Sequence, residues 1–121
     1  MFRSYIDDID PSERQLYWVL MFALYPFFSE SSHFALNRIL SQEGAVRGTP
    51  GWEIDFIEDE YGDHVYHVWA DSNSSGMEPS DQFYRVETVR DAVRESLLHL
   101  GRGFPEKTSE ITKVIVDYKL K

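Results

Sequence analysis

Hydrophobic residues near the start of the chain recur with the spacing of an α-helix. The residues at positions i, i+3, i+4, i+7 and i+8 are Leu16, Val19, Leu20, Ala23 and Leu24. The preceding Asp10-Pro11-Ser12-Glu13 offers an Asx cap, a proline at the first helical position and a Glu that can complete a capping box. We therefore predict a helix that runs to about Tyr25, packs on most of its faces and is stopped by Pro26.

A second, shorter helix is indicated after Pro26. Ser31 or Ser32 can cap it, and its apolar positions continue to Leu40. We expect it to end before Gly44, and the glycine-rich stretch from Gly44 to Gly51 to be a loop.

The pattern then changes to the alternation of β-strands. Trp52, Ile54 and Phe56 alternate with two carboxylates, and after a turn at residues 60–63 the apolar pattern resumes at residues 65–69. These two segments predict a hairpin. Residues 71–76 are predicted to be an exposed loop and residues 82–86 a third short strand.

The last third of the chain predicts one helix and one strand. Thr88 can cap a helix that presents a narrow apolar stripe and ends at Gly101 in a left-handed conformation. Residues 111–120 alternate in β-branched side chains and predict a final strand. The expected order is α-α-β-β-β-α-β over residues 1–121. We therefore predict a single α+β domain with a mostly antiparallel four-stranded sheet and helices packed on one face.

Composition narrows the functional classes. The 121 residues are 42% hydrophobic and 15% aromatic, which is typical of a folded domain with a core. The chain has no Cys, so disulfides and thiolate chemistry are excluded and a cytoplasmic location is expected. The longest uncharged apolar run, Leu16 to Phe28, is shorter than the roughly 20 residues that span a bilayer, and the acidic start lacks the character of an export signal.

Charge is distributed very unevenly. Between Gly48 and Tyr84 there is no Lys or Arg, while the rest of the chain holds equal numbers of acids and bases, so this window carries the whole net charge of -9. Its nine carboxylates are Glu53, Asp55, Glu58, Asp59, Glu60, Asp63, Asp71, Glu78 and Asp81. Such a field attracts cations or basic proteins. Direct binding of nucleic acid is not expected, because it requires a basic stripe.

Aromatic residues are interleaved with these carboxylates. Trp52, Phe56 and Trp69 are candidates for the core, whereas Tyr61, Tyr66, Phe83 and Tyr84 are candidate anchors for a partner. The predicted partner-binding residues are Glu53, Asp55, Glu58, Asp59, Glu60, Tyr61, Asp63, Tyr66, Asp71 and Tyr84. The alternative is a solvated strand edge whose carboxylates prevent pairing with other chains.

No catalytic motif stands out. The chain has no G-x-S-x-G, phosphate-binding or metal-binding motif, so we expect no catalytic residues, no metal and no cofactor. A weak divalent-cation site at Glu58-Asp59-Glu60 and Asp63 is conceivable, since hard cations bind carboxylate oxygens. An enzyme that uses Asp55 with Glu53 or Glu58 as metal ligands or as general acid and base remains an alternative. A metal-dependent nuclease that uses the Asp117-Tyr118-Lys119 triplet of the last strand beside an upstream Asp such as Asp55 is a separate one.

Three stretches carry a resemblance to a known class of proteins. They are residues 51–56, the aromatic strand that ends in Trp69-Ala70-Asp71, and Phe83-Tyr84 leading into the helix of residues 89–100. In size, acidity and layout the chain resembles the immunity proteins of bacterial polymorphic and contact-dependent growth inhibition toxin systems. The resemblance implies a cytoplasmic protein that occludes the active site of a cognate basic toxin, often a nuclease. A regulatory domain for another basic protein is a further alternative.

Overall fold

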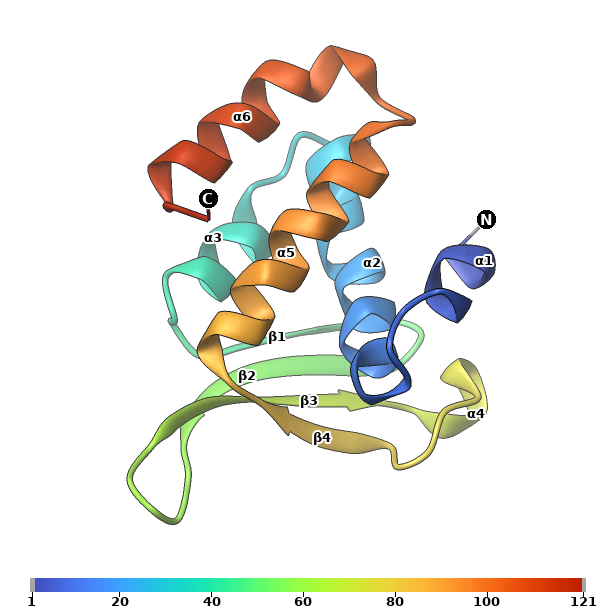
Figure 1. Cartoon of the computed structure of the whole chain (residues 1–121), viewed down its shortest axis with the longest axis vertical. Coiled ribbons are helices and arrows are strands. Elements are labelled where there is room, and N and C mark those ends of the chain that lie inside the picture. The colour runs from blue at the N-terminus through green and yellow to red at the C-terminus, as the bar shows by residue number, and fades with distance from the viewer. Residues whose placement is uncertain (1, 121) are drawn as a thin grey trace.

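The alternation of apolar and acidic residues that begins at Trp52 produces the centre of an antiparallel sheet. The computed structural model describes residues 2–120, and the sheet has the order β1-β2-β3-β4. Its strands are β1 (Ala45–Gly48), β2 (Trp52–Glu58), β3 (His64–Ala70) and β4 (Asp81–Tyr84). Each strand pairs antiparallel with the next (Figure 1). The predicted hairpin and the third strand are confirmed.

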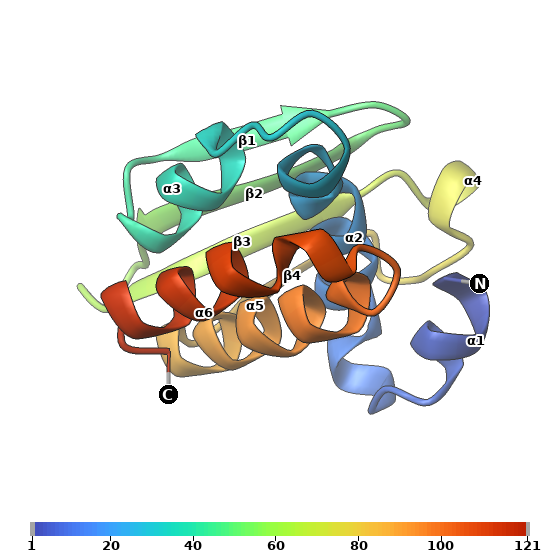
Figure 2. The ribbon, with the colours of Figure 1, turned by 90° about the horizontal axis from the view of Figure 1, so that it is seen from above.

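Helices lie on one side of this sheet. They are α2 (Arg14–Ser29), α3 (Phe34–Leu40), α5 (Val86–Gly101) and α6 (Thr108–Asp117), together with α1 (Phe2–Asp7), which packs on α2. The one-turn α4 (Ser72–Ser75) and the 3-10 turns η1 (Pro11–Glu13) and η2 (Pro105–Lys107) lie in the connections. Seen from above, α2, α3, α5 and α6 lie over the strands (Figure 2). The predicted α+β class, with a four-stranded antiparallel sheet and helices packed against it, is confirmed.

The start of the long helix follows the sequence, but its end does not. The Asp10 carboxylate accepts the Ser12 amide at 2.9 Å, as expected of an Asx cap, and the 3-10 turn η1 leads into α2. Pro26 was expected to stop the helix, yet α2 continues to Ser29. A proline inside a helix costs roughly 3 kcal/mol through the lost hydrogen bond and the ring clash. The burial of Phe27 and Phe28 beyond it accounts for the continuation.

The fourth strand of the sheet is not the predicted one. Residues 44–51 were expected to be a loop, but β1 pairs with β2 there and places Val46 opposite Ile54. Val46 is the only buried residue of β1. One buried residue gives no alternating pattern, so this edge strand was not recognised in the sequence. Its stability derives from pairing with β2 rather than from local propensity.

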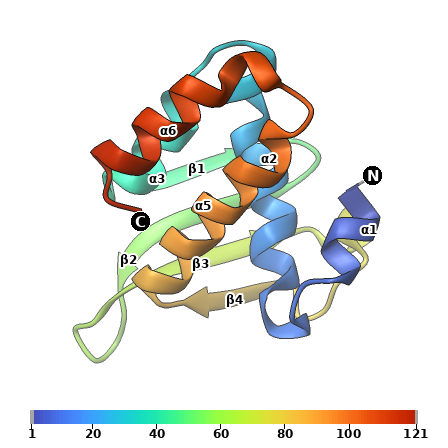
Figure 3. The ribbon, with the colours of Figure 1, turned by 45° about the horizontal axis from the view of Figure 1, so that its top comes forward.

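The predicted final strand, residues 111–120, is wrong, since most of this segment belongs to helix α6. Its inward residues are Ile111, Val114, Ile115 and Tyr118, which have the i, i+3, i+4, i+7 spacing of a helix. The β-branched composition concealed this second periodicity. Helix α6 packs on α5, on the side away from the sheet (Figure 3), and the Tyr118 hydroxyl donates to Asn37 of α3 at 3.0 Å.

Three smaller expectations are also wrong. Helix α5 begins at Val86, so Thr88 does not cap it, and it continues through Gly101 to a right-handed cap at Arg102. Residues 72–75 form the turn of helix α4 with Ser75 buried, where an exposed loop was expected.

Within the described residues no helix is both long and apolar enough to cross a membrane.

Candidate partner-binding face

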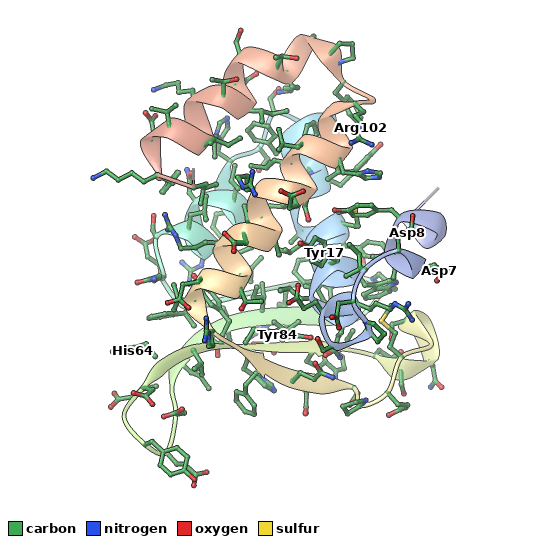
Figure 4. All side chains as sticks on the ribbon, viewed as in Figure 1. Asp7, Asp8, Tyr17, His64, Tyr84 and Arg102 are labelled. Carbon is green, nitrogen blue, oxygen red and sulfur yellow. The ribbon has the colours of Figure 1, made fainter. Side chains whose placement is uncertain are left out.

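The face of the sheet opposite the helices is open. Strand alternation places ten side chains on it, and we call this set the open sheet face: Ala45, Arg47, Glu53, Asp55, Ile57, Val65, His67, Trp69, Asp81 and Phe83. The strand partners on the inner face, such as Ile54 and Val68, are buried under the helices. Figure 4 shows side chains that project from the sheet on the side away from the helices.

Two cross-strand rows organise the open sheet face. In the first row, Asp55 lies opposite His67, and His67 lies opposite Phe83. In the second row, Glu53 lies opposite Trp69, and Trp69 lies opposite Asp81. The rings of His67 and Phe83 are 4.9 Å apart between centroids, and His67 Nε2 lies 3.8 Å from Asp81 Oδ2. Directly opposed side chains of this kind form the contacts of a sheet surface.

Strand β1 contributes a cation, Arg47, to this face, whereas residues 48–84 contain no Lys or Arg. The Arg47 guanidinium donates to the Glu53 carboxylate at 2.9 Å, directly across the β1–β2 pair. Glu53 is therefore neutralised within the fold. Asp55, in contrast, forms no ion pair with any described residue. The open sheet face carries three carboxylates against one guanidinium, so it remains negative.

The connection between β2 and β3 projects from the sheet, away from the helices (Figure 1), and is strongly acidic. We call residues 58–63 the acidic turn. The Asp59 carboxylate accepts the amides of Tyr61 and Asp63, each at 2.9 Å, so Asp59 holds the shape of the turn. Gly62 has φ of 83°, which favours glycine. Glu58, Glu60 and Asp63 form no ion pair among the described residues.

Tyr61 is exposed at the tip of the acidic turn, with 80% of its surface accessible. The other two tyrosines predicted as anchors are not accessible: Tyr66 is 1% exposed and Tyr84 is 7% exposed. Tyr66 donates to the Ile39 carbonyl, and Tyr84 lies on the inner side of the sheet (Figure 4) and donates to the Gln82 side-chain oxygen at 2.7 Å. Burial raises the pKa of both hydroxyls to about 12. Their prediction as partner anchors is therefore wrong.

Asp71 also lies apart from the acidic turn. It follows β3 at the end of the sheet where β2 begins, and its backbone amide donates to the Gly51 carbonyl at 2.8 Å. Its carboxylate accepts the Ser74 hydroxyl at 3.1 Å, at the start of α4. The predicted partner-binding residues thus fall into three places: the acidic turn, the open sheet face with Glu53 and Asp55, and Asp71 at the opposite end.

Sequence reasoning placed only Glu53 and Asp55 of the open sheet face in the predicted set, and Arg47, His67, Trp69 and Phe83 are among the residues that it missed. Arg47 lay in a predicted loop, His67 was treated as an ordinary strand residue, and Trp69 was assigned to the core. Phe83 was considered as an anchor but left out of the predicted set, and it is 60% exposed. The available signal was the alternation within β3, since Tyr66 shares a face with Val68 and Ala70 and so leaves His67 and Trp69 outside.

A shallow pocket of about 410 Å³ opens at the base of the acidic turn. Its charged lining residues are Asp59, Asp63, His64, Arg85 and Glu87. Arg85 lies 3.3 Å from Glu87, and the His64 ring stacks on Phe56 with centroids 5.3 Å apart. The lining therefore combines both signs of charge.

The placement of Asp117 and Lys119 beside Asp55, which the nuclease alternative requires, is not present. Asp117 lies at the end of α6, where Lys113 donates to it at 2.8 Å, and not on a strand beside Asp55. The sheet and the other helices separate these two carboxylates. Across residues 2–120, no group of three or more His, Asp or Glu side chains converges in a way that could hold a metal ion.

Comparison with protein-family models, with curated protein sequences and with solved structures returned no match for this chain.

Proposed function

We propose that this protein binds a basic protein partner and neutralises it, as an immunity protein neutralises its cognate toxin by covering the active site. The observation that carries this proposal is the set of carboxylates on the acidic turn, Glu58, Glu60 and Asp63, that form no ion pair among the described residues. The backbone of this turn projects from the sheet, away from the helices (Figure 1). An exposed field of one sign accelerates association with a surface of the opposite sign. A nuclease toxin would suit this arrangement, because its substrate-binding surface must be basic.

The position of the acidic turn supports inhibition rather than simple solvation. Asp59 is committed to the backbone of the turn, so the neighbouring carboxylates are presented from a fixed loop and not from a flexible tail. Preorganisation lowers the entropy cost of binding. A projecting, rigid, acidic loop can enter the basic cleft of an enzyme in place of its substrate.

Co-expression tests this proposal. The product of the neighbouring gene is expressed alone and with this protein, and cell survival and co-purification are measured. We expect toxicity alone, protection by the wild type, and slower association at high salt than at low salt. A neighbouring product that is harmless, or that does not co-purify, would refute the immunity assignment.

Two triple variants test whether the acidic turn forms the contact with the partner. Glu58, Glu60 and Asp63 are replaced by Lys in one variant. Glu43, Asp91 and Glu106, which are exposed acids of the helical side without ion pairs, are replaced by Lys in the control. Both variants change the net charge equally. We expect the first to slow association by about 10-fold or more and the control to have a clearly smaller effect. Equal effects would mean that only the net charge matters.

A further inference from the structure

We infer that the open sheet face is a binding platform for arginine side chains of the basic partner, with Trp69 and Phe83 as the stacking surface and Asp55 as the counter-ion. This inference deepens the proposed function and rests on it for the basic nature of the partner. It assigns a second contact, separate from the acidic turn, and a specific side-chain chemistry.

The open sheet face, which no other element of residues 2–120 covers (Figure 1), carries two aromatic side chains. Phe83 is 60% exposed on the edge strand β4, and its ring contacts only His67 among the described aromatic residues. Trp69 is half-buried on β3 and lies diagonally next to Phe83 on the same face. An exposed phenylalanine next to a half-buried tryptophan on an accessible sheet face is typical of interface anchors.

Acidic side chains surround these two rings. Three carboxylates share the face: Glu53 is paired with Arg47, Asp81 lies 3.8 Å from His67 Nε2, a contact that is an ion pair only when the histidine is protonated, and Asp55 is the third. Asp55 is the carboxylate left without an ion pair among the described residues of this face. It lies opposite His67 and diagonally next to Trp69, whereas Phe83 lies one strand further on, beyond His67. An incoming cation can therefore contact Asp55 and the Trp69 ring together, and a neighbouring cation can reach Phe83.

The combination of aromatic rings and a carboxylate favours arginine over lysine as the partner's cation. A guanidinium group is planar, stacks on aromatic faces and donates in a fork to a carboxylate, whereas an ammonium group is a strongly hydrated point charge. A flat surface with aromatic rings beside one free carboxylate favours the guanidinium. A second copy of this chain is disfavoured as the occupant, because two negative faces repel each other. Charge complementarity thus points to an arginine-bearing partner surface.

The test uses two defined probes, a hexa-arginine peptide and a hexa-lysine peptide, titrated into isotope-labelled protein and followed by NMR. We expect the arginine peptide to bind about threefold or more tightly than the lysine peptide, as a cation–π contribution at an exposed site requires. The largest amide and indole shifts should occur at Asp55, His67, Trp69 and Phe83.

Matched variants separate stacking from charge. Phe83→Ala should abolish the preference for arginine over lysine, whereas Phe34→Ala, which removes a phenylalanine 65% exposed on α3, should leave it unchanged. Asp55→Asn should weaken both peptides. The two phenylalanines have similar exposure, so any difference between their variants reports on position and not on loss of surface.

Four results would overturn the inference: no binding of either peptide, equal affinity for both, shifts confined to the acidic turn, or a Phe83→Ala variant that behaves like Phe34→Ala. Sedimentation measures the oligomeric state and supplies a further contradicting result. If the wild type were a dimer and Phe83→Ala a monomer, the open sheet face would bind a second copy of this chain. The co-expression assay judges the proposed function independently. A protein that protects cells but shows no arginine preference would retain the function and lose only this platform.

Discussion

The Tyr66 hydroxyl donates a hydrogen bond of 2.6 Å to the carbonyl of Ile39, 27 positions earlier in the chain. This contact joins the centre of the sheet to the last turn of α3 in the interior of the protein. Tyr66 is also among the largest fully buried side chains. Tyr66, which the charge pattern placed at the surface, therefore links the sheet to α3 within the core.

We predict that Tyr66→Phe lowers the free energy of unfolding by about 1 to 2 kcal/mol. The ring and its packing are retained, so the loss comes from the hydrogen bond. The Ile39 carbonyl still accepts the Gln42 amide at 3.3 Å, which keeps the cost near the lower end. Urea denaturation measures the change, and Tyr61→Phe at the exposed tip is the control. Equal stability of the two variants would contradict the structural role of Tyr66.

The pH dependence of stability is predicted to include a contribution from His99. Its ring stacks on Tyr5 with centroids 3.7 Å apart, joining α5 to α1. Burial, with a smaller effect of the nearby Arg102, lowers the pKa of His99 below its usual value near 6.5. The neutral ring therefore favours folding above about pH 6.5, and this contribution is lost as the pH falls through the lowered pKa.

His99→Phe keeps an aromatic ring against Tyr5 but cannot take up a proton. We expect the unfolding free energy of the wild type to fall more steeply than that of His99→Phe between about pH 7 and about pH 5. Urea denaturation at several pH values measures both slopes. Parallel curves for the two proteins would show that His99 titrates alike in the folded and unfolded states.

A third prediction concerns the close approach of Gly48 to Trp52. A Cβ atom added at Gly48 would lie 2.7 Å from Trp52 Cζ2, and the Trp52 indole is held by its donation to the Thr49 carbonyl at 2.9 Å. Gly48→Ala should therefore destabilise the protein by about 1 to 3 kcal/mol. At Gly103 the nearest atom would be 3.7 Å away, so Gly103→Ala is the control. Thermal or urea unfolding that ranks the two variants in the opposite order would refute this packing argument.

The sequence predicted best those elements whose periodicity was unambiguous. The β2–β3 hairpin alternates strictly, and α5 has a single apolar stripe, so pattern alone located them. Residues 111–118 satisfy two periods at once, because their β-branched residues alternate while Ile111, Val114, Ile115 and Tyr118 also fall on one helical face. Packing against α5 decided between them, and such a tertiary contact is not visible in a local window.

The candidate site was predicted less completely than the fold. A count of charges along the chain located the acidic turn correctly, since its residues are neighbours in sequence. The open sheet face instead combines residues from four strands, and Arg47 reaches Glu53 only through the β1–β2 register. Because the strand at residues 45–48 was not predicted, neither the neutralisation of Glu53 nor the isolation of Asp55 could be inferred from sequence.

The last prediction concerns Lys107, a buried cation at the start of α6. Its ammonium donates to the Ser31 hydroxyl at 2.9 Å, lies 3.3 Å from a Glu110 oxygen and sits 5.2 Å from the centroid of the Phe27 ring. Removing one member of a buried ion pair is costly when it strands the other charge. Here Glu110 is about half exposed and can be hydrated, so the lost charge should matter less than the lost packing of the side-chain stem.

We therefore expect Lys107→Met, which keeps an apolar stem, to be more stable than Lys107→Ala by about 1 to 2 kcal/mol. Lys113→Met, at an exposed Lys that pairs with Asp117, serves as the control and should show no measurable change. Urea denaturation of the three variants decides between the two contributions. If Lys107→Met were as destabilised as Lys107→Ala, the ammonium and its contacts with Ser31 and Phe27, and not the stem, would be what fixes α6 to the end of α2.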